Sequence, residues 1–149
     1  MTKHASWIHG HAFRAQREGY ALSKTYLGWG AAYQTHGGEW FQIAIPTPVI
    51  VGSIDTQLKK VFVLYRTFGT AKITAVHLWD GVTKIQAFDG LGLAGDHSGV
   101  LDNDNTWQIN PVHIKWGLGI SVYVDFGPPS KIGVPKIEFT SAGADFYTP

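Results

Sequence analysis

The sequence predicts an all-β fold in which antiparallel strands form a β-sandwich, and three observations support this prediction. Apolar and polar side chains alternate with a period of two along most of the chain. Glycine and proline stand between the alternating segments, where they are typical of turns. No segment has the period of 3.6 residues that an amphipathic helix requires. We expect about eight strands in a jelly-roll or Greek-key arrangement, with a closed β-barrel as the alternative.

The alternating segments are short, and turn residues bound each of them. In chain order, we expect strands at residues 6–15, 27–34, 39–45, 59–68, 71–81, 83–90, 117–126 and 134–140. The segment 117–126 alternates most regularly, which places four side chains on a core face: Ile120, Val122, Val124 and Phe126. No linker or change in composition divides the chain, so residues 1–149 are expected to form one domain.

Two neighbouring segments give the strongest pairing signal. Apolar side chains occupy both faces of residues 59–68, as in a central strand that is covered on both sides. A Gly-Thr turn at 69–70 leads into residues 71–81, so we expect the two segments to pair as a hairpin. An Asp-Gly turn at 80–81 then leads into residues 83–90.

One long segment, residues 90–111, interrupts this pattern of strands and turns. It is rich in glycine and aspartate and has little strand signal. Long loops in compact domains are usually either functional or disordered. Because this one contains several large apolar side chains, we expect it to pack against the protein and to be ordered.

The charge content of the chain predicts its partners. Charged residues make up 15% of the sequence, well below the share of about 25% in typical soluble domains. A small domain exposes much of its surface, so sparse charge predicts a neutral or apolar surface. Either self-association into a homo-oligomer or an aromatic ligand-binding face would explain it, and we expect the homo-oligomer. The net charge is only +1 and the lysine and arginine residues are scattered, so no nucleic-acid partner is expected.

The absence of cysteine means that neither a disulfide nor a thiolate site is possible. The first residues lack the apolar run of a signal peptide, and no segment approaches the length of a membrane span. We therefore expect a cytoplasmic protein without a membrane span. Secretion by a non-classical route would be compatible with the same sequence.

Two histidines stand two positions apart in the segment SWIHGHAF, at His9 and His11. On an extended strand, residues i and i+2 point to the same face about 7 Å apart, so both imidazoles should share a face with Trp7 and Phe13. Three uses are open: packing, contact with a ligand or substrate, and a zinc-type site completed by a third histidine. Packing is the favoured interpretation, and a ligand-facing wall is the preferred functional one.

The long loop contains a second set of candidate residues. Its GLGLAG segment matches a dinucleotide-binding pattern, but no helix follows to receive a pyrophosphate, so that function is rejected. Asp96, His97 and Ser98 are consecutive, whereas triad members seldom are neighbours in sequence. Asp96 or His97 acting as a single general acid or base is the better catalytic hypothesis. Hydrogen bonding within a turn is the structural alternative.

Oxygen-bearing side chains cluster further along the loop. Asp102 and Asp104 alternate as carboxylates do at the start of a calcium loop, although the glycine and terminal glutamate of an EF-hand are missing. They are weak candidates for calcium, as His9 and His11 are for zinc, and otherwise no cofactor is expected. Ordinary turn chemistry is the favoured explanation.

Six tryptophans are spread over the predicted strands. Trp29 lies between two glycines, which leave its ring uncovered by neighbours, and Trp107 lies within the long loop. An exposed indole ring beside polar groups suits sugar recognition. The candidate ligand-binding residues are therefore Trp7, His9, His11, Trp29, Asp96, His97 and Trp107.

Three functions from different classes follow from these observations. The preferred one is a lectin-like, non-catalytic module that self-associates and binds a small neutral ligand, plausibly a carbohydrate. The second is a small cofactor-independent isomerase, cyclase or lyase that uses histidines in an aromatic pocket. The third is a structural subunit of a homo-oligomeric assembly.

Overall fold

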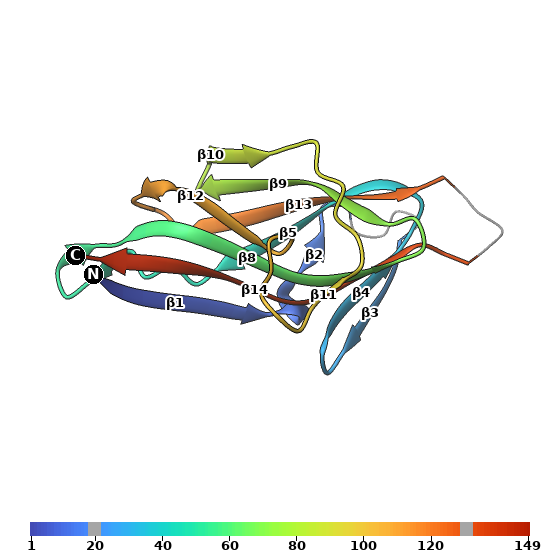
Figure 1. The fold of residues 1–149 in the computed structure, drawn as a ribbon, viewed down its shortest axis with the longest axis horizontal. Coiled ribbons are helices and arrows are strands. Elements are labelled where there is room, and N and C mark those ends of the chain that lie inside the picture. The colour runs from blue at the N-terminus through green and yellow to red at the C-terminus, as the bar shows by residue number, and fades with distance from the viewer. Residues whose placement is uncertain (18–21, 129–132) are drawn as a thin grey trace.

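Two antiparallel sheets pack face to face in the structure, a computed structural model that describes residues 1–17, 22–128 and 133–149 (Figure 1). Each sheet ends in edge strands instead of closing on itself. The prediction of an all-β, antiparallel sandwich is therefore confirmed, and the alternative of a closed barrel is wrong for the described ranges.

Seven strands form the larger sheet. Its main path runs β11–β8–β14–β4–β3, while β1 pairs with β14 and β12 pairs with β8. The bounds of these strands are β1 (Thr2–His9), β3 (Ser23–Leu27), β4 (Gly30–Gln34), β8 (Gln57–Phe68), β11 (Asp96–His97), β12 (Thr106–Val112) and β14 (Lys136–Thr148).

Five strands form the second sheet, in the order β10–β9–β13–β5–β2. Their bounds are β2 (Arg14–Ala15), β5 (Gly37–Ile45), β9 (Lys72–Asp80), β10 (Thr83–Phe88) and β13 (Leu118–Gly127). A separate hairpin consists of β6 (Ile50–Val51) and β7 (Ile54–Asp55), and one 3-10 turn, η1, spans Gly10–Ala12. Nowhere in the described ranges does the chain form a helix with the length and apolar character of a membrane span.

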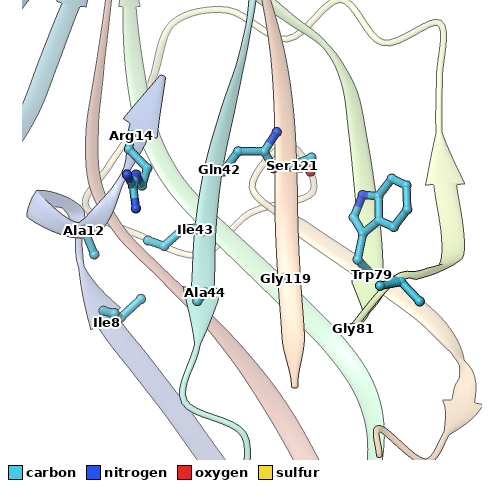
Figure 2. Close-up of a pocket in the computed structure, with 11 residues that line it drawn as sticks. Ile8, Ala12, Arg14, Gln42, Ile43, Ala44, Trp79, Gly81, Gly119 and Ser121 are labelled. Carbon is cyan, nitrogen blue, oxygen red and sulfur yellow. Dashed lines mark hydrogen bonds between the residues drawn. The ribbon is translucent and has the colours of Figure 1, made fainter. Parts of the chain in front are cut away.

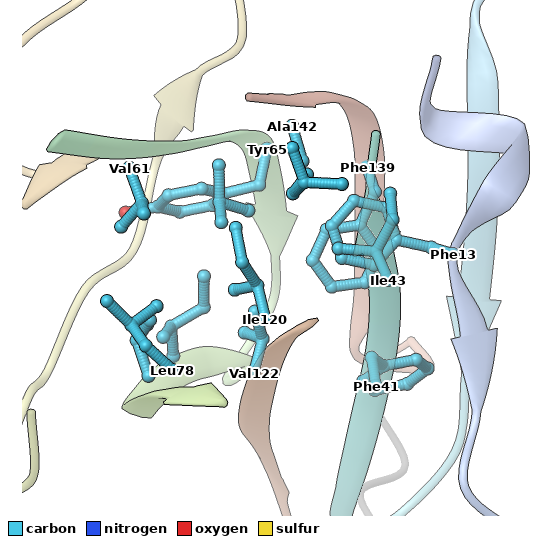
Figure 3. Packing of buried hydrophobic residues seen from close by; sticks show 14 of the residues in the cluster. Phe13, Phe41, Ile43, Val61, Tyr65, Leu78, Ile120, Val122, Phe139 and Ala142 are labelled. Atoms are coloured by element: carbon cyan, nitrogen blue, oxygen red, sulfur yellow. The ribbon is translucent and has the colours of Figure 1, made fainter. Parts of the chain in front are cut away.

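The hydrophobic core lies between the two sheets, where apolar side chains from both inner faces interdigitate (Figure 3). The alternation predicted for β13 is confirmed, since all four of its expected core side chains are completely buried. Aromatic rings fill one end of the core, where Phe13 stacks on Phe139 with the ring centroids 4.0 Å apart. Tyr33 and Phe41 pack beside them, with centroids 4.7 Å apart. The packed core holds the two sheets together and fills the space between their described strands, so we look for a binding site on the outer faces.

The expected hairpin between residues 59–68 and 71–81 is wrong. β8 belongs to the seven-stranded sheet and β9 to the five-stranded sheet, so the turn at Gly69 carries the chain from one layer to the other. A glycine turn reverses the chain, but it does not determine whether the two strands then pair in one sheet. The second predicted turn is confirmed, because β9 and β10 form a hairpin in which Asp80 is opposite Thr83.

The expected single strand at residues 6–15 is also wrong. β1 ends at His9, and η1 then turns the chain towards the other sheet, where β2 begins at Arg14. Gly10 permits this turn, because a Cβ at that position would lie 2.1 Å from the carbonyl oxygen of Phe139. As a result, Phe13 is only 1% exposed and points into the core, away from the face that carries Trp7.

Three other segments differ from their predicted boundaries. Residues 27–34 contain the turn between β3 and β4 instead of one strand. The strand expected at 134–140 continues to Thr148 as β14, which pairs with β8, β1 and β4. Within residues 90–111, short pieces of strand join the seven-stranded sheet, and Leu93 exchanges backbone hydrogen bonds with Ile73. The long loop therefore packs against the sandwich as expected.

The strand β1 lies along its whole length beside the second half of β14. Thr2 is opposite Thr148, and His9 is opposite Ser141. The two ends of the chain consequently lie together at one end of the sandwich (Figure 1).

Candidate functional site

The outer face of the five-stranded sheet contains a groove. Part of its floor is a row of cross-strand neighbours in which two small residues follow a tryptophan. Trp79 on β9 is directly opposite Gly119 on β13, and Gly119 is directly opposite Ala44 on β5. A Cβ at Gly119 would come no closer than 3.8 Å to any neighbouring heavy atom. The Trp79 ring therefore does not cover the glycine, and the row leaves a hollow beside the indole (Figure 2).

This groove has a volume of about 620 Å³. It extends from β1, η1 and β2 across β5 and β13 to the turn after β9. Its lining residues are Ile8, Ala12, Arg14, Gln42, Ile43, Ala44, Trp79, Gly81, Val82, Gly119 and Ser121. Arg14 is the charged member of this set, so the groove offers a mainly neutral surface (Figure 2).

A second row of residues crosses the same face and supplies polar groups. His77, Ser121, Gln42 and Arg14 are consecutive cross-strand partners on β9, β13, β5 and β2. The Ser121 hydroxyl donates a hydrogen bond to Gln42 Oε1. Gln42 Nε2 in turn donates to Gln16 Oε1 at 2.8 Å. These bonds hold the amide and hydroxyl groups in fixed positions at the base of the groove.

A smaller compartment of about 240 Å³ continues the groove on the far side of Gln42 and Ser121. Trp40 and His77 line it, with their ring centroids 4.8 Å apart. Tyr123 packs edge-on against Trp40, with a centroid distance of 5.1 Å. His77 Nε2 lies 2.8 Å from Asp89 Oδ1, which fixes the orientation of the imidazole. The sheet thus presents two indole rings with polar side chains between them.

A bulge in β9 sets the direction of these side chains. Tyr123 is opposite Ala75, whereas Val124 is opposite Ile73, so Thr74 is an extra residue in the pairing. An extra residue reverses the alternation from that point. Ile73 is therefore buried, while His77 and Trp79 point outward.

Trp7 lies on the opposite side of the molecule from the groove. It is 42% exposed on the outer face of the seven-stranded sheet, where it is the partner of Gly143. The indole stacks on Phe62, with ring centroids 5.0 Å apart and planes at 19°. One face of the ring is thus occupied by the protein itself.

His9 and His11 do lie together, but a turn and not a strand brings them there. Their ring centroids are 4.0 Å apart. His9 Nδ1 accepts a hydrogen bond from the backbone N–H of His11 at 3.1 Å and so caps η1. His11 Nε2 contacts the carbonyl oxygen of Leu27. Each imidazole therefore has one nitrogen engaged in local structure.

His97, Asp102 and Asp104 form a second cluster, beside β8. His97 Nδ1 lies 2.8 Å from Asp102 Oδ2, and His97 Nε2 lies 2.9 Å from the carbonyl oxygen of Ala94. The Asp104 carboxylate is further away, with Oδ2 at 3.9 Å from Nε2. Both ring nitrogens face acceptor oxygens, which a protonated imidazole satisfies by donating at each nitrogen. The ring packs on Tyr65, with a centroid distance of 5.2 Å.

These contacts shift the ionisation of the cluster. Burial opposes protonation of His97, but the hydrogen bonds to Asp102 and to the Ala94 carbonyl raise its pKa above the usual value. Burial alone would raise the pKa of Asp102, but its hydrogen bond with His97 helps to lower that pKa below the usual value. Hydrogen bonds from the hydroxyl and N–H of Ser98 lower the pKa of Asp96. Both hydrogen bonds on Asp96 are of the kind expected in a turn.

The remaining predicted tryptophans have different surroundings. Trp29, in the turn between β3 and β4, is 37% exposed, and the Arg66 guanidinium lies 4.7 Å from its ring centroid. Trp107 is only 7% exposed and packs in the core, so the expected exposed platform at this position is wrong. A tryptophan on the inner face of β12 fills the sandwich.

The structure therefore brings the predicted residues together as separate clusters and not as one wall. Among the residues described, no group of three or more His, Asp or Glu side chains is arranged to hold a metal ion. The groove consists instead of residues that our sequence analysis did not select, chiefly Trp79, Trp40, His77, Gln42 and Ser121. The signal available in the sequence was the alternation that places His77 and Trp79 on one face of residues 71–81.

Comparisons with known proteins give little further information. No protein-family model matches the chain, and no curated protein matches it. Among solved structures, the chain is similar to TmCBM61, whose structure was determined in complex with beta-1,4-galactotriose. The sequence identity is 12%, the match covers 93% of this chain and 88% of that chain, and the TM-score is 0.40.

Proposed function

We propose that the groove on the five-stranded sheet binds a neutral saccharide without chemical conversion. The observation that supports this is the combination of an indole ring, Trp79, with uncharged hydrogen-bonding side chains in one open hollow. A sugar presents apolar C–H faces, which stack on indole rings, and hydroxyl groups, which bond to amides and hydroxyls. Gln42 and Ser121 supply the polar partners at fixed positions.

The catalytic alternative has weaker support from the geometry. An isomerase, cyclase or lyase of the predicted kind needs at least two histidines in one aromatic pocket. In the described groove, His77 is the one histidine that lines either compartment. His9, His11 and His97 contribute to other clusters, so a binding function is preferred over a reaction.

Self-association stays a prediction from the sparse charge. Apolar side chains such as Ile50 and Ile54 are exposed on the β6–β7 hairpin and would suit a contact between copies. Light scattering on the purified chain tests this point, and a monomer at micromolar concentration would contradict both the oligomer and the structural-subunit alternative.

A glycan array followed by titration calorimetry tests the proposed saccharide binding. The wild-type chain should bind a neutral glycan, and Trp79→Ala should weaken that binding by about tenfold or more, because the ring contact is lost. Trp29→Ala is the matched control, since it removes a part-exposed tryptophan from a turn of the other sheet. Equal binding by wild type and Trp79→Ala would contradict the proposal, as would an array without any bound glycan.

A further inference from the structure

Trp116 is the most exposed tryptophan of the described chain and lies beside the groove. It is 81% exposed, in the segment between β12 and β13. A Cβ at Gly81 would lie 3.1 Å from Trp116 Cβ and 3.5 Å from its ring atom Cγ. Gly81 itself lines the groove, so Trp116, although outside the lining, adjoins the end of the groove where Trp79 forms the wall.

The backbone that carries Trp116 is firmly held. The Asp80 carboxylate accepts hydrogen bonds from the backbone N–H groups of Lys115, at 3.0 Å, and of Trp116, at 2.9 Å. The Gly81 N–H donates to the carbonyl oxygen of Gly117 at 3.1 Å. An exposed apolar ring on a fixed backbone loses little entropy when it binds a ligand.

Gly81 and Val82 form the turn at this end of the groove. Gly81 has a φ of +55°, a conformation that favours glycine, and the absence of a side chain there lets Trp116 pack closely against the turn. Val82, which also lines the groove, is 96% exposed, so the described chain scarcely covers this turn. A ligand in the groove can therefore continue past Trp79 towards Trp116.

We propose that Trp116 forms a second stacking subsite and that the ligand is an oligosaccharide or a polysaccharide chain, not a free monosaccharide. This inference rests on the proposed function. The dimensions of the groove support it: the lining crosses from β2 over β5 and β13 to β9, and strands spaced about 4.8 Å apart make this roughly 14 Å. One sugar ring cannot fill that length and also contact Trp116, whereas a linear chain can do both.

The experiment measures affinity as a function of chain length. Titration calorimetry uses cello-, galacto-, manno- and xylo-oligosaccharides, each from the monosaccharide to the hexasaccharide, with wild type, Trp116→Ala and Trp79→Ala. For the series that binds, wild-type affinity should rise with length, with a step of about 3- to 10-fold once the chain reaches the second ring. Trp116→Ala should remove that step and leave the affinity for the short members unchanged. Because Trp116 is so exposed, its loss should not disturb folding, and the unchanged short ligands report this directly.

The outcomes separate the two proposals. Absence of binding by every series, or undiminished binding by Trp79→Ala, overturns the proposed function and this inference with it. Binding by wild type without a length-dependent step, or the same step in Trp116→Ala, overturns the second subsite alone. Loss of self-association by Trp116→Ala with unchanged glycan binding also overturns it, because the ring would then serve a contact between copies.

Discussion

Two tryptophan–glycine pairs, one on each sheet, have opposite effects on the surface. On the seven-stranded sheet, the row is Trp7, Gly143 and Phe62, and a Cβ at Gly143 would meet the Trp7 ring at 2.5 Å. The indole lies across the glycine and stacks on the phenylalanine, so the surface is filled. On the five-stranded sheet, the third member of the row is Ala44, which offers the indole of Trp79 no ring to stack on.

The difference shows that exposure of a tryptophan does not by itself mark a binding site. Trp7 is well exposed, yet it completes a packed patch of its own sheet. Trp79 is half-buried, yet a hollow remains beside it. The size of the residue two strands away decides whether the surface is filled or hollow. A large ring such as Phe62 stacks with the indole, whereas the methyl group of Ala44 does not.

The largest expected effect comes from Phe62→Ala. Phe62 is almost completely buried beneath Trp7, so its loss should lower the free energy of unfolding by about 3 kcal/mol. Trp79→Ala, which removes the ring of the row on the other sheet, should lower it by about 1 kcal/mol or less, since no second ring packs across that row. Urea unfolding of both variants measures the difference. Equal losses would show that the two rows are energetically alike.

The two glycines give the next test. Gly143→Ala should lower the free energy of unfolding by about 2 kcal/mol, because its Cβ would overlap the Trp7 ring and would lie 2.9 Å from the carbonyl oxygen of Ser6. Gly119→Ala meets no close neighbour and should change stability by about 0.5 kcal/mol at most. Urea unfolding curves of the two variants measure both free energies of unfolding. A larger loss of stability for Gly119→Ala than for Gly143→Ala would contradict the packing difference.

The smallest effect concerns pH and should be confined to the seven-stranded side. The pKa of His97 is raised in the folded state, so its pair with Asp102 contributes its full stabilisation below the ordinary histidine pKa of about 6.5. That stabilisation is lost as the pH rises through the raised pKa. The lowered pKa of Asp102 means that the same contribution is present above about pH 3.9 and is lost as the pH falls. Stability measured against pH should therefore decline from slightly acid to alkaline conditions.

His97→Gln provides the control for this pH dependence. The variant lacks the titrating ring, so its stability should change less between pH 6 and pH 9 than that of wild type. Glycan binding in the groove should be the same in both proteins, because His97 does not line it. A variant with the wild-type pH profile would show that another group titrates.

Local patterns in the sequence predicted some elements well and others poorly. Alternation at Ile120 and Val122 depends only on the strand period, and these side chains are buried as expected. The bulge at Thr74 and the turn after His9 interrupt that period for reasons that lie elsewhere in the chain. At Gly10, the reason is the close approach of β14, more than a hundred positions away in sequence.

The candidate site was still harder to predict. Its hollow depends on Trp79 being opposite Gly119 and on Gly119 being opposite Ala44, and no local rule gives these pairings. His9 and His11 attracted attention because they are close in sequence, but one of them caps a turn. Sequence proximity identifies clusters that share a loop, whereas a groove across a sheet takes one residue from each of several distant strands.

The pairing of β1 with β14 has a consequence for how the protein is made. Residues 2–9 emerge from the ribosome well before their hydrogen-bonded neighbours at 141–148. At a synthesis rate of about 5–20 residues per second, β1 waits roughly 7–29 s for its partner strand. Until β14 joins β1 to β8, Phe62 lacks the indole that later covers it. We therefore expect a chaperone to protect this edge of the nascent chain, and the docking of β1 to be a late folding step.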